Sequence, residues 1–117
     1  MTAHLITIGG GGFYGPEGGP NRMMLNMLNL TGRSRPRVCL IPTATADRPE
    51  TIQAFMHFFN RLGAHPGFLS LYCVPCADIE GWLSEYDAIY ISGGNTRNLL
   101  ALWKAWDFDA ILIRLMN

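Results

Sequence analysis

The chain has 117 residues, with nine basic and nine acidic side chains and a formal net charge of zero at pH 7. This length suits one domain with a buried core and is too short for two ordinary domains. Balanced charge without a run of either sign excludes the basic surface of a nucleic-acid-binding protein and that of a protein attracted to anionic membranes.

The sequence shows no signal-peptide core and no apolar stretch long enough to span a bilayer. Three cysteines are an odd number in a chain without a secretory signal, which favours free thiols in a reducing compartment. We therefore expect a cytoplasmic protein without a disulfide framework.

Short apolar runs alternate with helix-forming segments along the whole chain. Strands are expected at residues 4–9, 37–41, 67–72 and 87–92. Helices are expected at residues 21–30, 49–63, 76–86, 96–103 and 108–117. Strands this apolar are buried on both faces, so the order predicts an α/β fold, a parallel sheet with helices on both sides.

Several residues mark the expected helix ends. Pro49 fits the first turn of the second helix and Gly63 fits its end. Asp78 and Asp107 stand where N-caps of the third and last helices are expected.

In parallel sheets of this kind the ligand site lies outside the carboxyl ends of the strands. This rule brings three loops to one edge, at residues 9–21, 42–49 and 92–96. The functional residues are therefore sought in these loops.

The first loop contains Gly10 to Gly15, which fits the pattern G-x-G-x-x-G of a dinucleotide site after a strand. Its context is wrong, because the pattern needs a helix opening at the third glycine, and Pro16 and Pro20 follow here. No acidic residue follows the second strand either. We expect a loop that allows close backbone approach and no dinucleotide.

Other motifs for chemistry are weaker. Cys73 and Cys76 lie between a strand and a helix, as a thioredoxin-type redox pair would, but ordinary loop cysteines are the simpler interpretation. No serine stands in a G-x-S-x-G elbow. The histidines at positions 4, 57 and 65 have no partner spacing, and no metal-ligand cluster is present.

The turn Gly93-Gly94-Asn95-Thr96 separates an expected strand from an expected helix. Glycine amides ahead of a helix N-terminus can hold an anion, or the oxyanion of a tetrahedral intermediate in acyl transfer. Asn95 or Thr96 could equally act as a simple helix cap. The residues alone leave both interpretations open.

Three segments in this order, "ITIGGGGF", "CLIPTATAD" and "YISGGNTRNLLALW", together resemble the dipeptidase E family of serine peptidases, to which cyanophycinases are related. The resemblance covers essentially the whole chain. It implies a three-layer α/β/α fold with a mostly parallel sheet, similar to class I glutamine amidotransferases. It also implies a serine nucleophile with a histidine partner, no metal or other cofactor, and hydrolysis of Asp-X dipeptides or related isoaspartyl peptides.

The resemblance also assigns site residues. Gly93 and Gly94 match the glycines whose backbone helps to stabilise the oxyanion, and Asn95 and Thr96 match the turn that shapes the pocket. The glycine-rich segment is expected beside them, through Gly10, Gly11 and Gly12.

The family's nucleophile occupies a Gly-x-Ser-Ala-Gly-like elbow on the strand after the helix that begins at this turn. The sequence stops at Asn117, where that strand should begin, so residues 1–117 resemble the amino-terminal portion of one family domain, truncated after about four βα units. The serine and histidine are expected beyond residue 117. The chain alone is predicted to be inactive.

Two other functions remain as alternatives: a non-catalytic module that binds small anions or acidic peptides, and thiol redox chemistry at Cys73 and Cys76. The strand at residues 87–92 is also expected to leave an unpaired sheet edge, and the tail "AILIRLM" is strongly apolar. An open edge invites pairing with another chain. We therefore predict a homodimer or higher oligomer formed through this edge.

Overall fold

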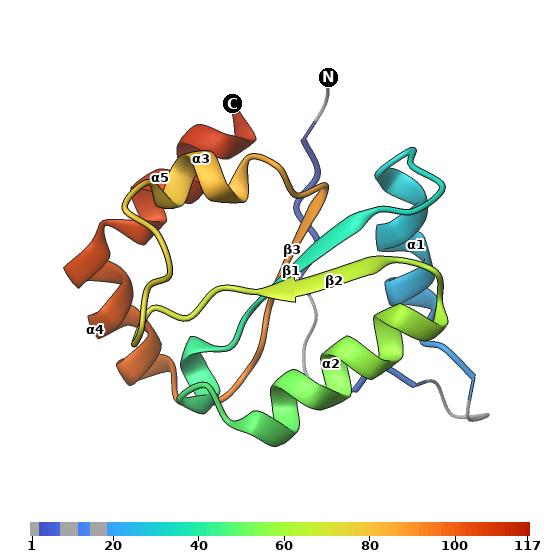
Figure 1. Ribbon diagram of the computed structural model, residues 1–117, viewed down its shortest axis with the longest axis horizontal. Coiled ribbons are helices and arrows are strands. Elements are labelled where there is room, and N and C mark those ends of the chain that lie inside the picture. The colour runs from blue at the N-terminus through green and yellow to red at the C-terminus, as the bar shows by residue number, and fades with distance from the viewer. Residues whose placement is uncertain (1–2, 8–11, 15–18) are drawn as a thin grey trace.

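The computed structural model describes residues 3–7, 12–14 and 19–117 (Figure 1). Its elements, in chain order, are α1 (Arg22–Leu30), β1 (Arg37–Ile41), a 3₁₀ turn (Thr43–Thr45), α2 (Pro49–Arg61), β2 (His65–Phe68), α3 (Ile79–Leu83), β3 (Ala88–Ile91), α4 (Thr96–Trp106) and α5 (Phe108–Met116).

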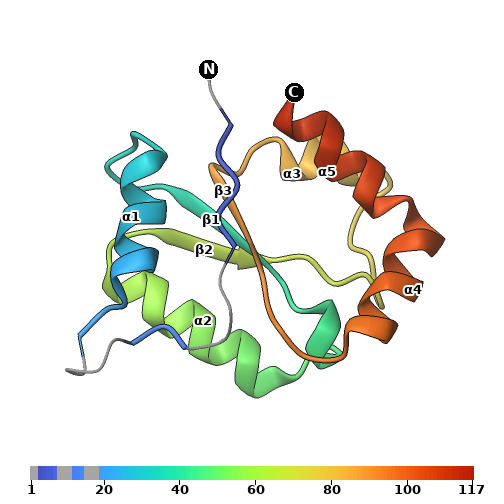
Figure 2. The same cartoon turned by 180° about the vertical axis from the view of Figure 1, so that it is seen from behind.

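The three strands form one parallel sheet in the order β2-β1-β3. At its centre, Cys39 is opposite Gly67 on one side and Ile89 on the other. Helices α1 and α2 lie on one face of this sheet, and α3, α4 and α5 lie on the other (Figures 1 and 2). The predicted α/β fold with a parallel sheet is confirmed.

The central strand supplies both halves of the core, because its side chains alternate between the two faces. Val38 and Leu40 are fully buried against α1 and α2. Cys39 and Ile41 are fully buried against α3 and α5, and Phe108 from α5 fills this second cluster. Both layers of helices therefore depend on β1.

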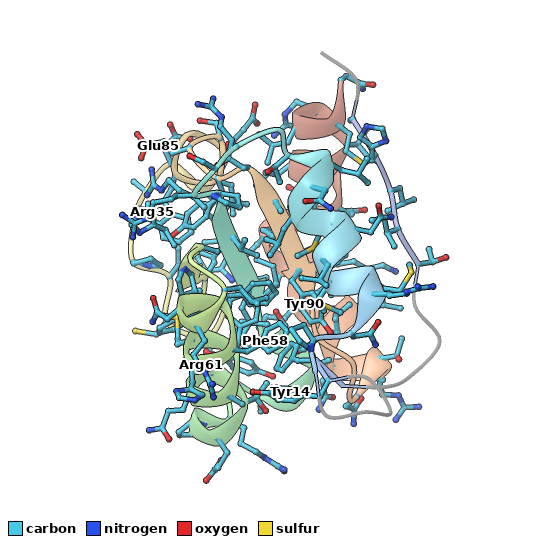
Figure 3. The ribbon with its side chains drawn as sticks, turned by 90° about the vertical axis from the view of Figure 1, so that its right-hand side faces the viewer. Tyr14, Arg35, Phe58, Arg61, Glu85 and Tyr90 are labelled. Carbon is cyan, nitrogen blue, oxygen red and sulfur yellow. The ribbon has the colours of Figure 1, made fainter. Side chains whose placement is uncertain are left out.

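An aromatic cluster joins α2 to the sheet. Phe58 stacks on Phe13 with ring centroids 5.0 Å apart and meets Phe59 edge to face at 4.9 Å. Figure 3 shows Tyr14, Phe58 and Tyr90 on this side of the sheet. The phenylalanines of α2 are core residues, as their helical spacing predicts.

The helix ends largely follow the sequence signals. Pro49 occupies the first turn of α2, and Gly63 follows that helix with φ of 82°. The Asp78 side chain caps α3 by accepting from the Gly81 amide at 3.0 Å. Asp107 is the N-cap residue of α5, but its side chain makes no capping bond, because its backbone has the left-handed conformation.

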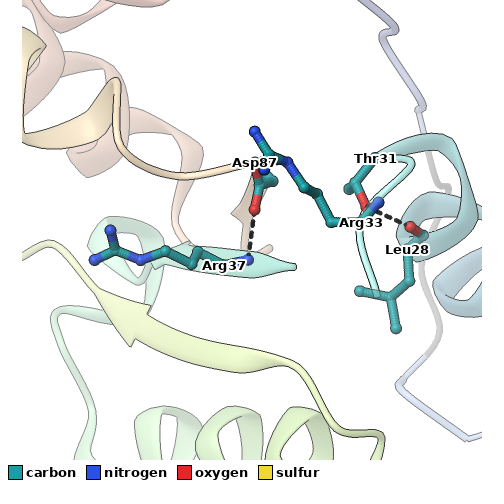
Figure 4. Close-up of polar contacts among 5 residues, drawn as sticks. All are labelled: Leu28, Thr31, Arg33, Arg37 and Asp87. Carbon is teal, nitrogen blue, oxygen red and sulfur yellow. Dashed lines mark hydrogen bonds and ion pairs between the residues drawn. The ribbon is translucent and has the colours of Figure 1, made fainter. Parts of the chain in front are cut away.

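The amino ends of β1 and β3 are held together by Asp87 (Figure 4). Its carboxylate accepts from the Arg37 amide at 2.8 Å, and its own amide donates to the Arg37 carbonyl at 2.8 Å. Arg33 adds an ion pair with the same carboxylate at 3.5 Å. This clamp fixes the register in which β3 runs beside β1.

The strand predicted at residues 4–9 is wrong for its described part. Residues 4–7 belong to no strand, and the Leu5 residue is 75% exposed; residues 8 and 9 lie outside the described ranges. Figures 2 and 3 show this segment passing the β3 side of the sheet. An apolar run predicts extended backbone but does not specify a partner strand, and residues 3–7 form no ladder with the edge strand β3.

The strand predicted at residues 67–72 is shifted. It runs from His65 to Phe68, and the chain bends after Leu69. The bend forms because the Ser70 hydroxyl accepts from the amides of Tyr72 and Cys73 at 3.1 and 2.8 Å. Leu69 and Leu71 stay buried without being in the strand, which explains the misleading apolar pattern.

None of the helices in the described ranges has the length and apolar character needed to cross a membrane.

The thiols provide a test of this packing. Burial raises the pKa of Cys39 to about 12, because the thiolate loses its hydration. At pH 8 about one Cys39 thiol in 10,000 is therefore ionised. A disulfide reagent that reacts with thiolates should modify Cys39 only after the protein unfolds. Cys73 is exposed and should react in the folded state.

The reaction is followed by the release of the coloured thiol, first in buffer and then in guanidinium chloride. Cys73→Ser should remove one equivalent from the fast phase, and Cys39→Ala should leave the fast phase unchanged. Equal rates for all three thiols in buffer would contradict the burial of β1.

Candidate functional site

Loops from the carboxyl ends of all three strands meet at one edge of the sheet. They comprise residues 42–48 after β1, 69–78 after β2 and 92–95 after β3. The start of α4 packs against the 3₁₀ turn in the first of these loops (Figure 1). The predicted convergence of the second and third loops is confirmed, and the loop after β2 joins them.

The turn after β3 is tied to the loop after β1 through the backbone. The Asn95 amide donates to the Ala44 carbonyl at 2.8 Å. The Ser92 amide and hydroxyl both reach the Ile41 carbonyl at 3.4 Å. These contacts hold the turn against the end of β1.

Gly94 is required by this close approach. Its φ of 151° disfavours any side chain, and a Cβ at this position would collide with the Ala44 carbonyl group, whose carbon would be 2.7 Å away. Gly93 differs, because a Cβ there would meet no atom within 4 Å. The two adjacent glycines therefore serve different purposes.

The helix cap that the sequence allowed at this turn is confirmed, and anion binding there stays a prediction. The Asn95 side chain caps α4 by accepting from the Asn98 amide at 3.0 Å. Gly93, Gly94 and Thr96 are exposed, and their amides have no acceptor among the described residues. Asn95 is thus committed to capping, while the neighbouring amides are free to hold an anion.

The electrostatics of α4 favour a negative ligand. The first turns of α2, α3 and α5 carry the acidic residues Glu50, Glu80 and Asp109, whereas those of α1 and α4 carry none. An acidic side chain there would partly neutralise the positive end of the helix. The N-terminus of α4 keeps its attraction for an external anion.

The expected glycine-rich neighbour is described only in part. Gly10 and Gly11 lie outside the described residues. Gly12 is exposed, its carbonyl accepts from the Asn21 side chain at 3.4 Å, and open space surrounds the place of a Cβ. Neither feature involves the turn at residues 93–96, so the proximity of the two segments stays a prediction.

Asp47 and Ser70 are polar residues of this edge that sequence reasoning did not select. Within the loop after β1, Asp47 follows Ala46, and both have left-handed backbones with φ of 55° and 54°. The Asp47 carboxylate accepts from the Ser70 hydroxyl, which is buried in the loop after β2. A charged residue among small loop residues, such as Asp47, is a sequence signal for a functional or structural role. Ser70 lies in an apolar run, and its sequence context gives no such signal.

The described ranges contain no hydrogen bond between a serine and a histidine. His4, His57 and His65 are exposed. The hydroxyl of Ser84 donates to the Gly81 carbonyl at 2.7 Å, and Ser34 is exposed. Burial also raises the pKa of Tyr90, so this phenol stays protonated at neutral pH and is no general base.

Other chemistry has little support among the described residues. They include no group of three or more His, Cys, Asp or Glu side chains placed to hold a metal ion. Cys73 and Cys76 are both free thiols in the loop at residues 69–78. The Cys76 sulfur contacts the Asp78 carbonyl at 3.7 Å. Redox activity of this pair stays a hypothesis.

Comparison with known proteins identifies the family of the chain. A family model described as peptidase family S51 matches residues 5–117. An uncharacterized peptidase, YgaJ of Bacillus subtilis (strain 168), is 44% identical over 110 residues, which cover 92% of this chain and 46% of the relative. The chain thus spans about half the length of this curated relative. With the match extending through all three loops of the candidate site, the chain belongs to peptidase family S51.

Proposed function

We propose that the turn at residues 93–96 forms the oxyanion side of a serine peptidase site that hydrolyses Asp-X dipeptides or related isoaspartyl peptides. The observation that carries the proposal is the pair of exposed Gly93 and Gly94 amides, which have no acceptor among the described residues. Membership of the peptidase family supports the reaction type.

Peptide hydrolysis by a serine develops negative charge on the carbonyl oxygen of the scissile bond. In the proposed reaction the amides of Gly93 and Gly94 donate to this oxygen, and Asn95 and Thr96 shape the adjoining pocket. The proposal keeps the expected proximity of the glycine-rich segment to this turn; Gly10 and Gly11 of that segment lie outside the described residues. One donor of this kind contributes about 100-fold to 1,000-fold in kcat.

The remaining catalytic groups complete the proposal. The serine nucleophile and its histidine base come from sequence beyond residue 117, in a protein comparable in length to the relative. No metal or cofactor takes part. The three free cysteines suit a reducing compartment, so the proposed location is the cytoplasm.

A non-catalytic module for small anions or acidic peptides is the second candidate. The same exposed amides favour it, together with the absence of a serine–histidine hydrogen bond from the described ranges. Both candidates require the turn to bind anions. They differ in whether a longer protein that contains these residues hydrolyses the peptide that it binds.

The substitution Gly94→Ala tests whether the turn at residues 93–96 binds anions, which both candidate functions require. Its side chain would displace the Ala44 contact, so binding of aspartyl-leucine should weaken about tenfold and the free energy of unfolding should fall by about 1–3 kcal/mol. A Cβ at Gly93 would meet no atom within 4 Å, so Gly93→Ala is the matched control for stability, with a change in the free energy of unfolding below about 1 kcal/mol. Binding is measured by amide NMR and stability by denaturant unfolding.

In the unsubstituted protein, millimolar aspartyl-leucine should shift the amide resonances of Gly93, Gly94 and Thr96. Gly32 and Gly63, which follow the ends of α1 and α2, are internal references that should not move. Uniform small shifts, or none at the turn, would contradict anion binding there.

Hydrolysis is a separate test. The 117-residue chain should release no aspartate from aspartyl-leucine above background, because an oxyanion site without a nucleophile recovers only a small part of the rate. Aspartate is measured by an enzyme-coupled assay after extensive purification. Release that survives purification and disappears in Gly94→Ala would show that the chain is active alone.

We further propose a homodimer or higher oligomer formed along β3. Among the described residues this strand pairs only with β1. Its residues 88–90 are half-buried, and Ile91 is 43% exposed. Ile91→Lys places a charge on the open edge and should shift the sedimentation profile from dimer to monomer. Ile113→Lys, at an exposed position of α5, is the control and should leave the dimer intact. A monomeric unsubstituted chain at micromolar concentration would refute the proposal.

A further inference from the structure

We propose that Asp47 is a positioning residue for the Gly93 and Gly94 amides, acting through the Ala44 carbonyl. This inference rests on the proposed anion site and goes beyond it, because Asp47 does not belong to the turn that would bind the ligand. Ser70 is its partner.

The first step is the role of the Ala44 carbonyl. It is the acceptor for the Asn95 amide at 2.8 Å, and Gly94 lies directly against the same carbonyl group. A shift of Ala44 therefore shifts the turn. The direction of the two glycine amides depends on where the loop after β1 holds this oxygen.

The second step is the conformation of that loop, which folds back on itself. The Ala46 amide donates to the Thr43 carbonyl at 3.0 Å, and the Asp47 amide donates to the Pro42 carbonyl at 3.1 Å. This fold needs left-handed backbones at Ala46 and Asp47, a conformation unfavourable for residues with a side chain. Such a segment persists only when its surroundings hold it in place.

The third step identifies what holds it. The Asp47 carboxylate accepts from the Ser70 hydroxyl, and Ser70 in turn accepts from the amides of Tyr72 and Cys73. The Tyr72 hydroxyl completes the connection by donating to the Thr43 carbonyl at 3.4 Å. The loops after β1 and β2 are thus locked together around one serine.

A direct role for Asp47 in holding the anion is unfavourable. Its charge is negative, so contact with the ligand would be repulsive. Its second oxygen, Oδ1, is buried and has no partner among the described residues. The hydroxyl of Thr43, in the same loop, is also buried without a partner among them. The loop is also held by the Tyr72 hydroxyl and by the Thr45 hydroxyl, which donates to the Pro42 carbonyl at 3.0 Å, but the bond of Asp47 with Ser70 is the one that involves a charged group.

The experiment compares Asp47→Ala with Asp47→Asn by amide hydrogen exchange in the ligand-free chain. Asp47→Ala should lower the protection of the Asn95 amide about tenfold or more, because a hydrogen bond to a charged group is lost. Asp47→Asn retains an oxygen acceptor for Ser70 and tolerates the left-handed backbone, so it should restore most of this protection. The amides of Phe55 and Phe59 in α2 report global stability.

The ratio of Asn95 to α2 protection decides the outcome. A selective loss at Asn95 with rescue by Asp47→Asn supports positioning, whereas a parallel loss at Asn95 and α2, or no loss, overturns it. Asp109→Ala, an exposed aspartate substitution in α5, should change neither. Ser70→Ala should reproduce Asp47→Ala.

A second arm measures aspartyl-leucine binding by amide NMR. Asp47→Ala should weaken it about fivefold or more, with recovery in Asp47→Asn. If the unsubstituted chain binds no dipeptide, the proposed function fails while the exchange ratio still decides whether Asp47 positions the turn. Unchanged binding in Asp47→Ala, beside clear binding in the unsubstituted chain, overturns the inference.

Discussion

The hydrogen bond from the Asn95 amide to the Ala44 carbonyl is the constraint on which the candidate site depends. A parallel sheet brings the loops after β1 and β3 to the same edge, but it does not orient their amides. This bond does so together with the contacts of Ser92 to the Ile41 carbonyl, and it forms because Gly94 has no side chain to collide with Ala44. The direction of the Gly93 and Gly94 amides is therefore set by the loop after β1 and not by the turn alone.

The same strand that leads to this loop organises the core. Val38 and Leu40 face α1 and α2, while Cys39 and Ile41 face α3 and α5. The Ile41 carbonyl then accepts from Ser92 at the start of the turn. Core packing and site geometry therefore share one element, and a substitution that displaces β1 should disturb both.

Much of this arrangement could be predicted because its signals are local. The strand at residues 37–41 and the helix opened by Pro49 have the bounds and the end signals that the sequence indicates. The predictions that were wrong or missing concern contacts between residues far apart in the sequence. Residues 4–7 are apolar, but apolarity does not say which strand edge is available. Asp47 was missed because its partner, Ser70, lies 23 residues away in a bend that resembles a strand.

The cap at residues 93–96 is compatible with the proposed anion site, and that site would depend on it. The Asn95 side chain satisfies the Asn98 amide, which would otherwise need a solvent molecule or a ligand. Capping by a neutral amide leaves the positive end of α4 intact, whereas an acidic residue would have neutralised part of it. Because the backbone of Asn95 is bound to Ala44 and its side chain to α4, the amides at this turn without an acceptor among the described residues include those of Gly93, Gly94 and Thr96. The turn can attract an anion because the helix behind it is capped without charge.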